Sequence, residues 1–136
     1  MSKISIIVAS ERLDKLYPAA TLAVTAAVMG WESEMFFTFW GLLALRKGFI
    51  PNEVSSDYRR FEDSLRKAIS SEALPNWHSL IMEGKKSGRL RIYACSATME
   101  LLNIKTEDLA EYVDGVAGAP TFLTSAKDSD ITLFIS

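Results

Sequence analysis

The fold of this chain is decided by the stretch Arg91-Ile92-Tyr93-Ala94-Cys95-Ser96-Ala97-Thr98-Met99-Glu100-Leu101-Leu102. Residues 89–94 have the short apolar pattern of a buried strand, and residues 96–103 follow as a helix. Cys95 stands at the corner, where unpaired N–H groups and the positive end of the helix dipole favour thiolate over thiol. The stretch predicts a strand–helix unit carrying a reactive thiol. The alternative is a buried structural cysteine, because free cysteine is among the most often buried residue types.

Strands and helices alternate on both sides of this corner. Further strands are expected at 4–9, 33–39, 112–116 and 130–135, and helices at 13–28, 42–45, from Leu74 to Gly84 or Gly88, and near 121–127. Pro18 requires the first of these helices to start later than Ser10 or to bend. The polar segment 51–71 is expected to be an insertion with its own amphipathic helix, on which Tyr58, Phe61 and Leu65 share a face.

Such alternation predicts an α/β fold with about five parallel strands and helices on both faces of the sheet. Function in such folds gathers at the carboxyl ends of the strands. Four corners are expected to share this edge, and they lie at Ser10-Glu11, Thr38-Phe39-Trp40-Gly41, Cys95-Ser96 and the glycine-containing loop from Gly115 to Gly118.

Length and composition indicate one globular domain over residues 1–136, since 49% of the residues are hydrophobic and 24% are charged. A net charge of -2 without a basic block argues against nucleic-acid binding. The uncharged run 16–31 is shorter than the roughly 18 residues of a membrane span. The N-terminus does not have the pattern of a signal peptide, so we expect a cytoplasmic protein.

The cysteine and histidine content limits the chemistry further. Cys95 is the only cysteine and His78 the only histidine. An internal disulfide, a CxxC pair and a metal site of ordinary composition are therefore not expected, and a reducing compartment is. His78 is expected to be solvated or locally bonded rather than a catalytic base. No cofactor is expected, because the chain contains neither a P-loop nor a full GxGxxG motif.

Three segments resemble the DsrE/DsrF-like family, especially its peroxiredoxin-like branch. They are Phe36-Phe37-Thr38-Phe39-Trp40-Gly41-Leu42, Leu13-Asp14-Lys15-Leu16-Tyr17-Pro18-Ala19, and the run from Cys95 to Ile104. The resemblance covers nearly the whole chain and implies a flavodoxin-like three-layer domain and a homo-oligomer. It also implies that Cys95 carries sulfur as a persulfide or thiosulfonate in sulfur relay or sulfur oxidation. The implied partners are TusA-type sulfur carriers, rhodaneses and heterodisulfide-reductase-like proteins.

Residues at the other corners are candidates for binding the carried group. Backbone N–H groups of Ser96 and Ala97, and of the loop from Gly115 to Gly118, are candidates for holding an anionic sulfonate. Thr38, Trp40 and Gly41 are candidates for lining the thiol pocket. Ser96 is expected to act mainly as the helix cap. The family's Met-Ser-Met after the cysteine corner is Ala97-Thr98-Met99 here, and the second cysteine of some branches is absent.

The sequence leaves three functions open. The first is a sulfur carrier or sulfurtransferase with Cys95 as its single active cysteine. The second is a one-cysteine thiol peroxidase, which the lack of a Thr-x-x-Cys arrangement weakens. The third is a non-catalytic module that binds an anion or nucleotide. The apolar surplus of a small chain favours a symmetric homo-oligomer in each case.

Overall fold

Five strands form a single sheet in the computed structural model, which describes all 136 residues. They are β1 (Lys3–Val8), β2 (Glu32–Phe37), β3 (Leu90–Cys95), β4 (Gly115–Ala117) and β5 (Ile131–Ile135). The strand order is β4-β3-β2-β1-β5, and every neighbouring pair is parallel. The prediction of an α/β fold with a five-stranded parallel sheet is confirmed.

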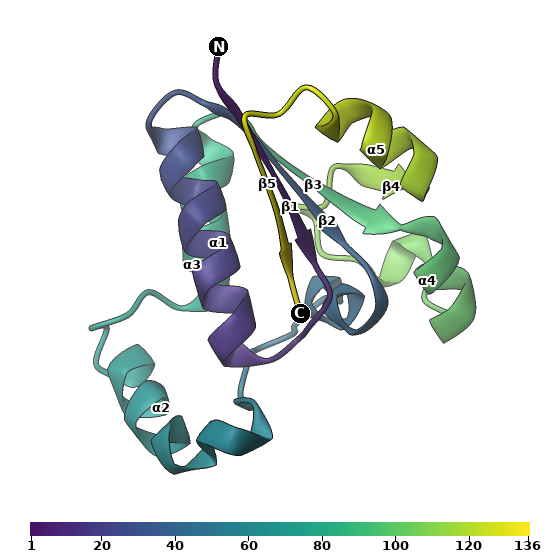
Figure 1. Cartoon of the computed structure of the whole chain (residues 1–136). Coiled ribbons are helices and arrows are strands. Elements are labelled where there is room, and N and C mark those ends of the chain that lie inside the picture. The colour runs from purple at the N-terminus through teal and green to yellow at the C-terminus, as the bar shows by residue number, and fades with distance from the viewer.

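The helices cover both faces of this sheet. Helices α1 (Leu13–Val28) and α3 (Trp77–Lys86) pack together on one face, and α5 (Ala119–Ala126) lies on the opposite face (Figure 1). Helix α4 (Ser96–Leu102) follows β3 directly. Three short 3-10 helices complete the connections: η1 (Phe39–Leu45), η2 (Ser56–Phe61) and η3 (Thr106–Asp108). The result is the three-layer arrangement of flavodoxin-like folds.

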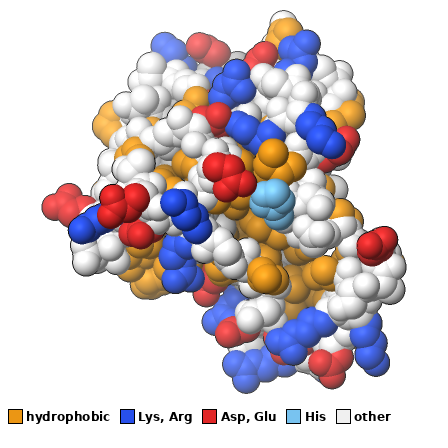
Figure 2. Space-filling view, turned by 180° about the vertical axis from the view of Figure 1, so that it is seen from behind, with side chains coloured by type: hydrophobic (Ala, Val, Ile, Leu, Met, Phe, Trp, Pro, Cys, Tyr) orange, Lys and Arg blue, Asp and Glu red, His pale blue; other side chains and the backbone are white.

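An arm formed by η2 and α2 (Glu62–Ser70) projects away from the sheet (Figure 1). No side chain of η2 or α2 is fully buried. Figure 2 shows Lys, Arg, Asp and Glu side chains gathered on this arm. The prediction that segment 51–71 contains its own helix is therefore confirmed.

Only one edge of the arm is attached to the body. Leu65 and Ile69 of α2 pack against a small buried cluster made by Leu13, Tyr17 and Val54. Tyr58 and Phe61, which we expected on the same face as Leu65, remain exposed instead. The reason is that both belong to η2, whose geometry differs from that of α2 and which contains a kink at Tyr58.

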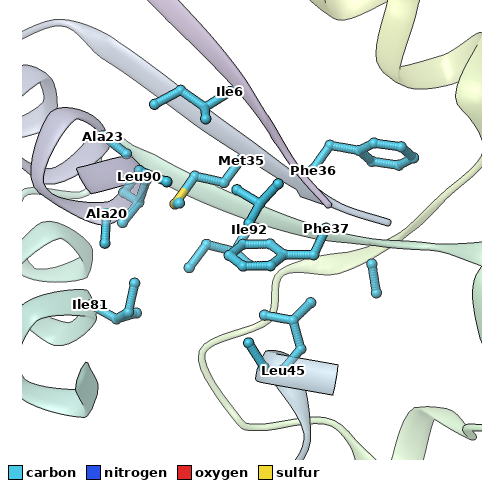
Figure 3. Close-up of a cluster of buried hydrophobic side chains, with 14 of the residues drawn as sticks. Ile6, Ala20, Ala23, Met35, Phe36, Phe37, Leu45, Ile81, Leu90 and Ile92 are labelled. Carbon is cyan, nitrogen blue, oxygen red and sulfur yellow. The ribbon is translucent and has the colours of Figure 1, made fainter. Parts of the chain in front are cut away.

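Side chains of β2 alternate between the two faces of the sheet, as the strand pleat requires. Met35 and Phe37 point into the layer formed by the sheet, α1 and α3, where Ile92 and Ile81 are also fully buried. Figure 3 shows Phe36 pointing to the opposite side from Phe37. The main core therefore lies under α1 and α3.

A buried carboxylate holds α5 to the other face. Glu34 is only 5% exposed. One of its oxygens accepts a hydrogen bond from Ser5 Oγ at 2.7 Å, and the other accepts one from Ser125 Oγ of α5 at 2.8 Å. The Lys3 ammonium lies 3.4 Å from the same carboxylate. Phe122 of α5 stacks on Phe36, with ring centroids 4.6 Å apart. A polar network and one aromatic stack thus fix α5.

Strand β2 ends earlier than its apolar run predicted. Residues 33–39 were expected as the strand, but β2 ends at Phe37, and Phe39 already begins η1 with a positive φ of 48°. The cause is Gly41, which packs directly on the end of β1. A Cβ at Gly41 would lie 2.2 Å from the carbonyl oxygen of Val8. The chain must therefore turn sharply after Thr38, and the expected helix at 42–45 begins at Phe39 instead.

Strand β4 starts later than predicted. Residues 112–116 were expected as the strand and 115–118 as a loop, yet the strand is Gly115–Ala117. Asp114 accounts for the start of β4. Its carboxylate accepts the hydrogen bond from the Ile92 N–H at 2.7 Å, so this N–H is not available to pair with the backbone of a residue before Asp114. Tyr112 is buried, with its hydroxyl accepting from Trp77 Nε1 at 3.2 Å. Its side chain therefore belongs to the core and not to a strand edge.

The remaining boundaries differ by a few residues. Helix α5 begins at Ala119, because Pro120 is well suited to a first helical turn, whereas we expected a start near Thr121. Helix α1 runs from Leu13 to Val28 through Pro18. None of the helices combines the length and the apolar content needed to cross a bilayer.

We predict that Gly41→Ala destabilises the fold by about 1–3 kcal/mol, because the added methyl group meets backbone atoms that cannot rotate away. Chemical denaturation measures this change. Gly115→Ala is the matched control, since its Cβ would come no nearer than 4.0 Å to another atom, the Tyr93 Cδ1. Equal stability of the two variants would contradict the close approach of Gly41 to Val8.

We predict that Glu34→Gln lowers the free energy of unfolding by about 1–3 kcal/mol, because it leaves Lys3 without a carboxylate and disturbs two buried hydrogen bonds. Glu32→Gln, on the same strand, is the control. Its side chain is exposed and lies 3.6 Å from Arg89, so its loss is expected to cost less than about 0.5 kcal/mol. Thermal melts of both variants test the difference, and a Glu34→Gln protein as stable as Glu32→Gln would contradict it.

Candidate functional site

Cys95 lies at the carboxyl edge of the sheet, as the sequence predicted. It is the last residue of β3 and the N-cap of α4, in an extended conformation with φ -69° and ψ 118°. Its neighbour across the ladder is Ala117, the last residue of β4. Cys95 is 6% exposed and forms part of the border of the main core. The thiol is therefore covered in this conformation.

Two threonines form the polar side of the site. Thr38 follows β2 and continues its pairing, because its N–H donates to the Val8 carbonyl at 3.0 Å. Thr98 lies in α4, three residues after Cys95, and is 2% exposed. The two hydroxyl oxygens are 3.3 Å apart. The N–H of Phe39 donates to Thr98 Oγ1 at 2.9 Å. The corners after β2 and β3 are thus joined through Thr98.

These groups influence the thiol in opposite directions. Burial acts to raise the pKa of Cys95 and is the largest single influence, but the hydroxyls of Thr98 and Thr38 and the N–H groups of Thr98 and Ala97 act against it. The net result is a pKa below the usual value of a thiol. No capping hydrogen bond to the Cys95 side chain is formed at the start of α4. The N–H groups therefore act mainly as nearby dipoles.

An exposed aromatic pair stands beside the threonines. Phe39 and Trp40 are 52% and 53% exposed, and their rings meet edge to face with centroids 5.8 Å apart. Phe39 adopts the left-handed backbone region, which is unfavourable for a bulky residue. Trp40 was predicted to line the pocket. The structure places it on the surface next to the second corner, and Gly41 is buried against Val8.

The predicted anion-binding residues are distributed unevenly. Ser96 is the first residue of α4 and does not cap it, contrary to our expectation, because Cys95 itself occupies the N-cap. Ser96 and Ala97 are both exposed. Gly118 lies close to them, since a Cβ there would be 3.6 Å from Ser96 Oγ. Gly115 pairs with Tyr93, two residues before Cys95, and lies farther from the thiol.

Thr98 and Phe39 were not among the predicted site residues. A signal for Thr98 was present, because the residue three positions after a helix N-cap faces the side chain of the cap. The role of Phe39 depends on its backbone N–H and on a positive φ. Neither the backbone N–H bond nor the positive φ can be recognised from the type of residue.

His78 lies apart from the thiol site. Its Nε2 is 3.3 Å from Glu111 Oε1, and both side chains are exposed. Together with Trp77 and Tyr112 they line an open cavity of about 270 Å³ whose lining does not include Cys95. Figure 2 shows the histidine at a hollow with apolar side chains around it. The expectation of a locally bonded surface histidine is confirmed.

Comparisons with known proteins identify a family and full-length relatives that are similar to this chain. The model of the DsrE/DsrF/DrsH-like family matches residues 1–59 and 55–134. A protein of Allochromatium vinosum named sulfur carrier protein DsrE2 is 31% identical over 160 aligned residues, covering 98% of each chain. The uncharacterized protein YrkE of Bacillus subtilis is 26% identical and covers 96% of this chain and 95% of its own.

Solved structures show the same fold at low sequence identity. The E. coli protein YchN superposes with a TM-score of 0.63 and 15% identity, covering 98% of this chain and 99% of that one. MTH1491 of Methanobacterium thermoautotrophicum, a protein of unknown function, gives 0.59 and 12% at the same coverage. With a family model that matches nearly every residue and a relative of 31% identity over the full length, this chain belongs to the DsrE/DsrF/DrsH-like family.

Proposed function

We propose that this protein is a cytoplasmic sulfur carrier that holds sulfur on Cys95 as a persulfide or thiosulfonate. The observation that carries the proposal is the position of the only thiol, at the junction of β3 and α4 with a lowered pKa. The full-length relation to a protein named as a sulfur carrier supports a sulfur-carrier role in general.

One thiolate suffices for this chemistry. In loading, the Cys95 thiolate attacks the outer sulfur of a donor persulfide, a new S–S bond forms, and the donor thiolate leaves with the electron pair of the broken bond. With tetrathionate, the attack on an inner sulfur releases thiosulfate and leaves a thiosulfonate on Cys95. Unloading is the same exchange with an acceptor thiolate as the nucleophile. A resolving cysteine is not needed, which suits a chain with a single cysteine.

The burial of Cys95 adds a requirement. Cys95 is only 6% exposed, so its thiol does not meet a partner's thiol without movement of the residues that cover it. The turn from Thr38 to Gly41 is the side of the site that carries exposed aromatic rings. We infer that docking of a donor or acceptor protein at this turn accompanies exchange. TusA-type carriers, rhodaneses and heterodisulfide-reductase-like proteins are the proposed partners.

Self-association belongs to the same proposal. Phe134 of β5 is 64% exposed and pairs across the sheet with Ile7 of β1. Both side chains lie on the face that carries α5, but α5 stacks on Phe36 of the next strand instead. This uncovered apolar surface supports a homo-oligomer.

We predict that incubation with polysulfide or tetrathionate adds the mass of sulfur atoms or of a thiosulfonate group to the intact protein. The adduct must disappear on reduction and must be absent from Cys95→Ser. Intact-mass spectrometry measures both. An unmodified wild-type mass under donor excess would reject the carrier role. Consumption of peroxide with an external thiol, lost in Cys95→Ser, would favour the peroxidase instead, and ligand-induced stabilisation that survives Cys95→Ser would favour a binding module.

We also predict the pH dependence of Cys95 alkylation. A lowered pKa keeps the thiolate populated as the pH falls below the usual pKa of a thiol, so the alkylation rate should begin to fall only at a lower pH than for free cysteine. Limited access of the reagent to the sulfur lowers the rate at every pH, whereas the midpoint of the profile reports the net pKa. Iodoacetamide modification followed by mass spectrometry gives the profile, and the protein unfolded in denaturant serves as the control. A midpoint at or above that of the unfolded chain would contradict the prediction.

A further inference from the structure

We propose that the open cavity beside His78 is a second binding site, and that it takes a small monoanionic acid whose apolar body is about one ring in size. The cavity has a volume of about 270 Å³. Figure 2 shows it as a hollow next to the histidine, with apolar side chains around it. Cys95 does not line it, so this site is separate from the thiol site and the proposal does not depend on the sulfur-carrier function.

Three segments that are distant in the sequence form the cavity. They are residues 46–50 after η1, residues 77–78 in the first turn of α3, and residues 110–112. The first and third segments are joined by main-chain contacts, since the N–H of Ala110 donates to the Leu45 carbonyl at 2.8 Å. Arg46 and Leu109 form an isolated antiparallel bridge beside this bond. The backbone on these two sides of the cavity is therefore held in place.

The aromatic residues of the lining have no free polar atom to offer a ligand. Trp77 and Tyr112 are 4% and 6% exposed. Trp77 Nε1 donates to the Tyr112 hydroxyl at 3.2 Å, and this hydroxyl donates to the Ala44 carbonyl at 3.3 Å. Phe49 and Ile50 add further apolar surface, and Ile50 is itself 76% exposed. Such a lining favours a ligand with an apolar body.

Arg46 adds a cation that has no carboxylate partner. It takes part in none of the ion pairs of the protein. Its Nε donates to the Leu43 carbonyl at 3.1 Å, and its guanidinium carbon lies 6.0 Å from the centre of the Phe49 ring. The N–H donors on its two Nη atoms remain free, and their planar arrangement suits a carboxylate. An acid whose ring packs on the apolar lining can therefore place its charged group at Arg46.

The charges around the cavity favour a single negative charge on the ligand. Glu111 also lines the cavity, but its Oε1 lies 3.3 Å from His78 Nε2. Its pKa is lowered by its own backbone N–H, by His78 and more weakly by Lys47. Arg46 and Lys47 contribute two positive charges and Glu111 one negative charge, which leaves +1 with the histidine counted as neutral. A monoanion balances this charge.

The volume of the cavity limits the size of the ligand. Sites for drug-sized molecules have volumes of about 300–1,000 Å³. A cavity of about 270 Å³ lies just below that range. It therefore suits an acid with a single ring rather than a larger cofactor.

The test is isothermal titration calorimetry of the full chain with 3-phenylpropionate and with its uncharged amide, 3-phenylpropionamide. The acid should show saturable binding that is tighter than that of the amide. Arg46→Met keeps an apolar stem and removes the charge, so it should weaken binding of the acid by roughly fivefold, the upper range for a solvent-exposed ion pair, and leave the amide unaffected. Arg59→Met is the matched control, because Arg59 belongs to η2 on the arm and does not line the cavity.

A second variant tests the apolar lining. Ile50→Ser removes a contact available to both probes, so the two affinities should fall by a similar factor. Leu123→Ser is the control, because Leu123 is also an exposed apolar residue, at 61%, but lies on α5 outside the cavity. It should bind both probes as the wild type does.

Three results would overturn the inference: no saturable binding of the acid to the wild type, equal affinities for acid and amide, or an Arg46→Met protein that binds the acid as tightly as the wild type. Equal affinities would assign the cavity to an uncharged apolar group, such as a side chain of a partner protein. If Arg46→Met does not fold, as judged by circular dichroism, Arg46→Gln supplies the same loss of charge. Arg46→Met is expected to load sulfur on Cys95 as the wild type does, so failure of this site and failure of the carrier function are separate outcomes.

Discussion

The backbone of Gly41 lies against the carbonyl group of Val8, and the geometry of the thiol site depends on this contact. A methyl group in place of the Gly41 hydrogen would come within 2.2 Å of the carbonyl oxygen. The chain leaving β2 must therefore fold back over the end of β1 within a few residues. Phe39 absorbs the turn with a positive φ, and its N–H then meets Thr98 in α4. A close approach between the backbones of β1 and η1 thus sets the surroundings of a side chain on β3.

A site without charged side chains suits a carrier that both receives and releases sulfur. A nearby cation would lower the basicity of the thiolate strongly, yet nucleophilicity falls together with basicity. An isolated buried thiol would instead have a raised pKa and form little thiolate, since burial favours its neutral form. Hydroxyl and amide dipoles stabilise the thiolate less than a cation does and more than an apolar environment does. At Cys95 they outweigh burial and leave the pKa lowered. The thiolate then forms more readily than in an ordinary thiol without becoming a poor nucleophile.

The sequence predicted the sheet well because parallel buried strands have short apolar runs that differ from the longer period of the helices. It predicted Cys95 at a strand–helix corner for the same reason. Strand ends were less predictable, since β2 stops where Gly41 meets Val8 and β4 starts where Asp114 takes the Ile92 N–H. Both are contacts between distant segments. Thr98 was missed although it stands three positions after the Cys95 cap, because its hydrogen bond from the Phe39 N–H joins two corners that are far apart in the sequence.

Side chains on the two faces of β2 pack against different helices. Met35 and Phe37 build the core under α1 and α3, whereas Glu34 and Phe36 hold α5. Gly118, the N-cap of α5, lies next to Ser96 and directly follows β4, whose last residue pairs with Cys95. Glu34 and Thr38 lie on the same face of this strand, about 13 Å apart along it. The Glu34 carboxylate is therefore too distant to act on the thiol directly, but it anchors α5, and the start of α5 forms one wall of the site. The stability of the Glu34 network and the shape of the thiol site are linked in this way.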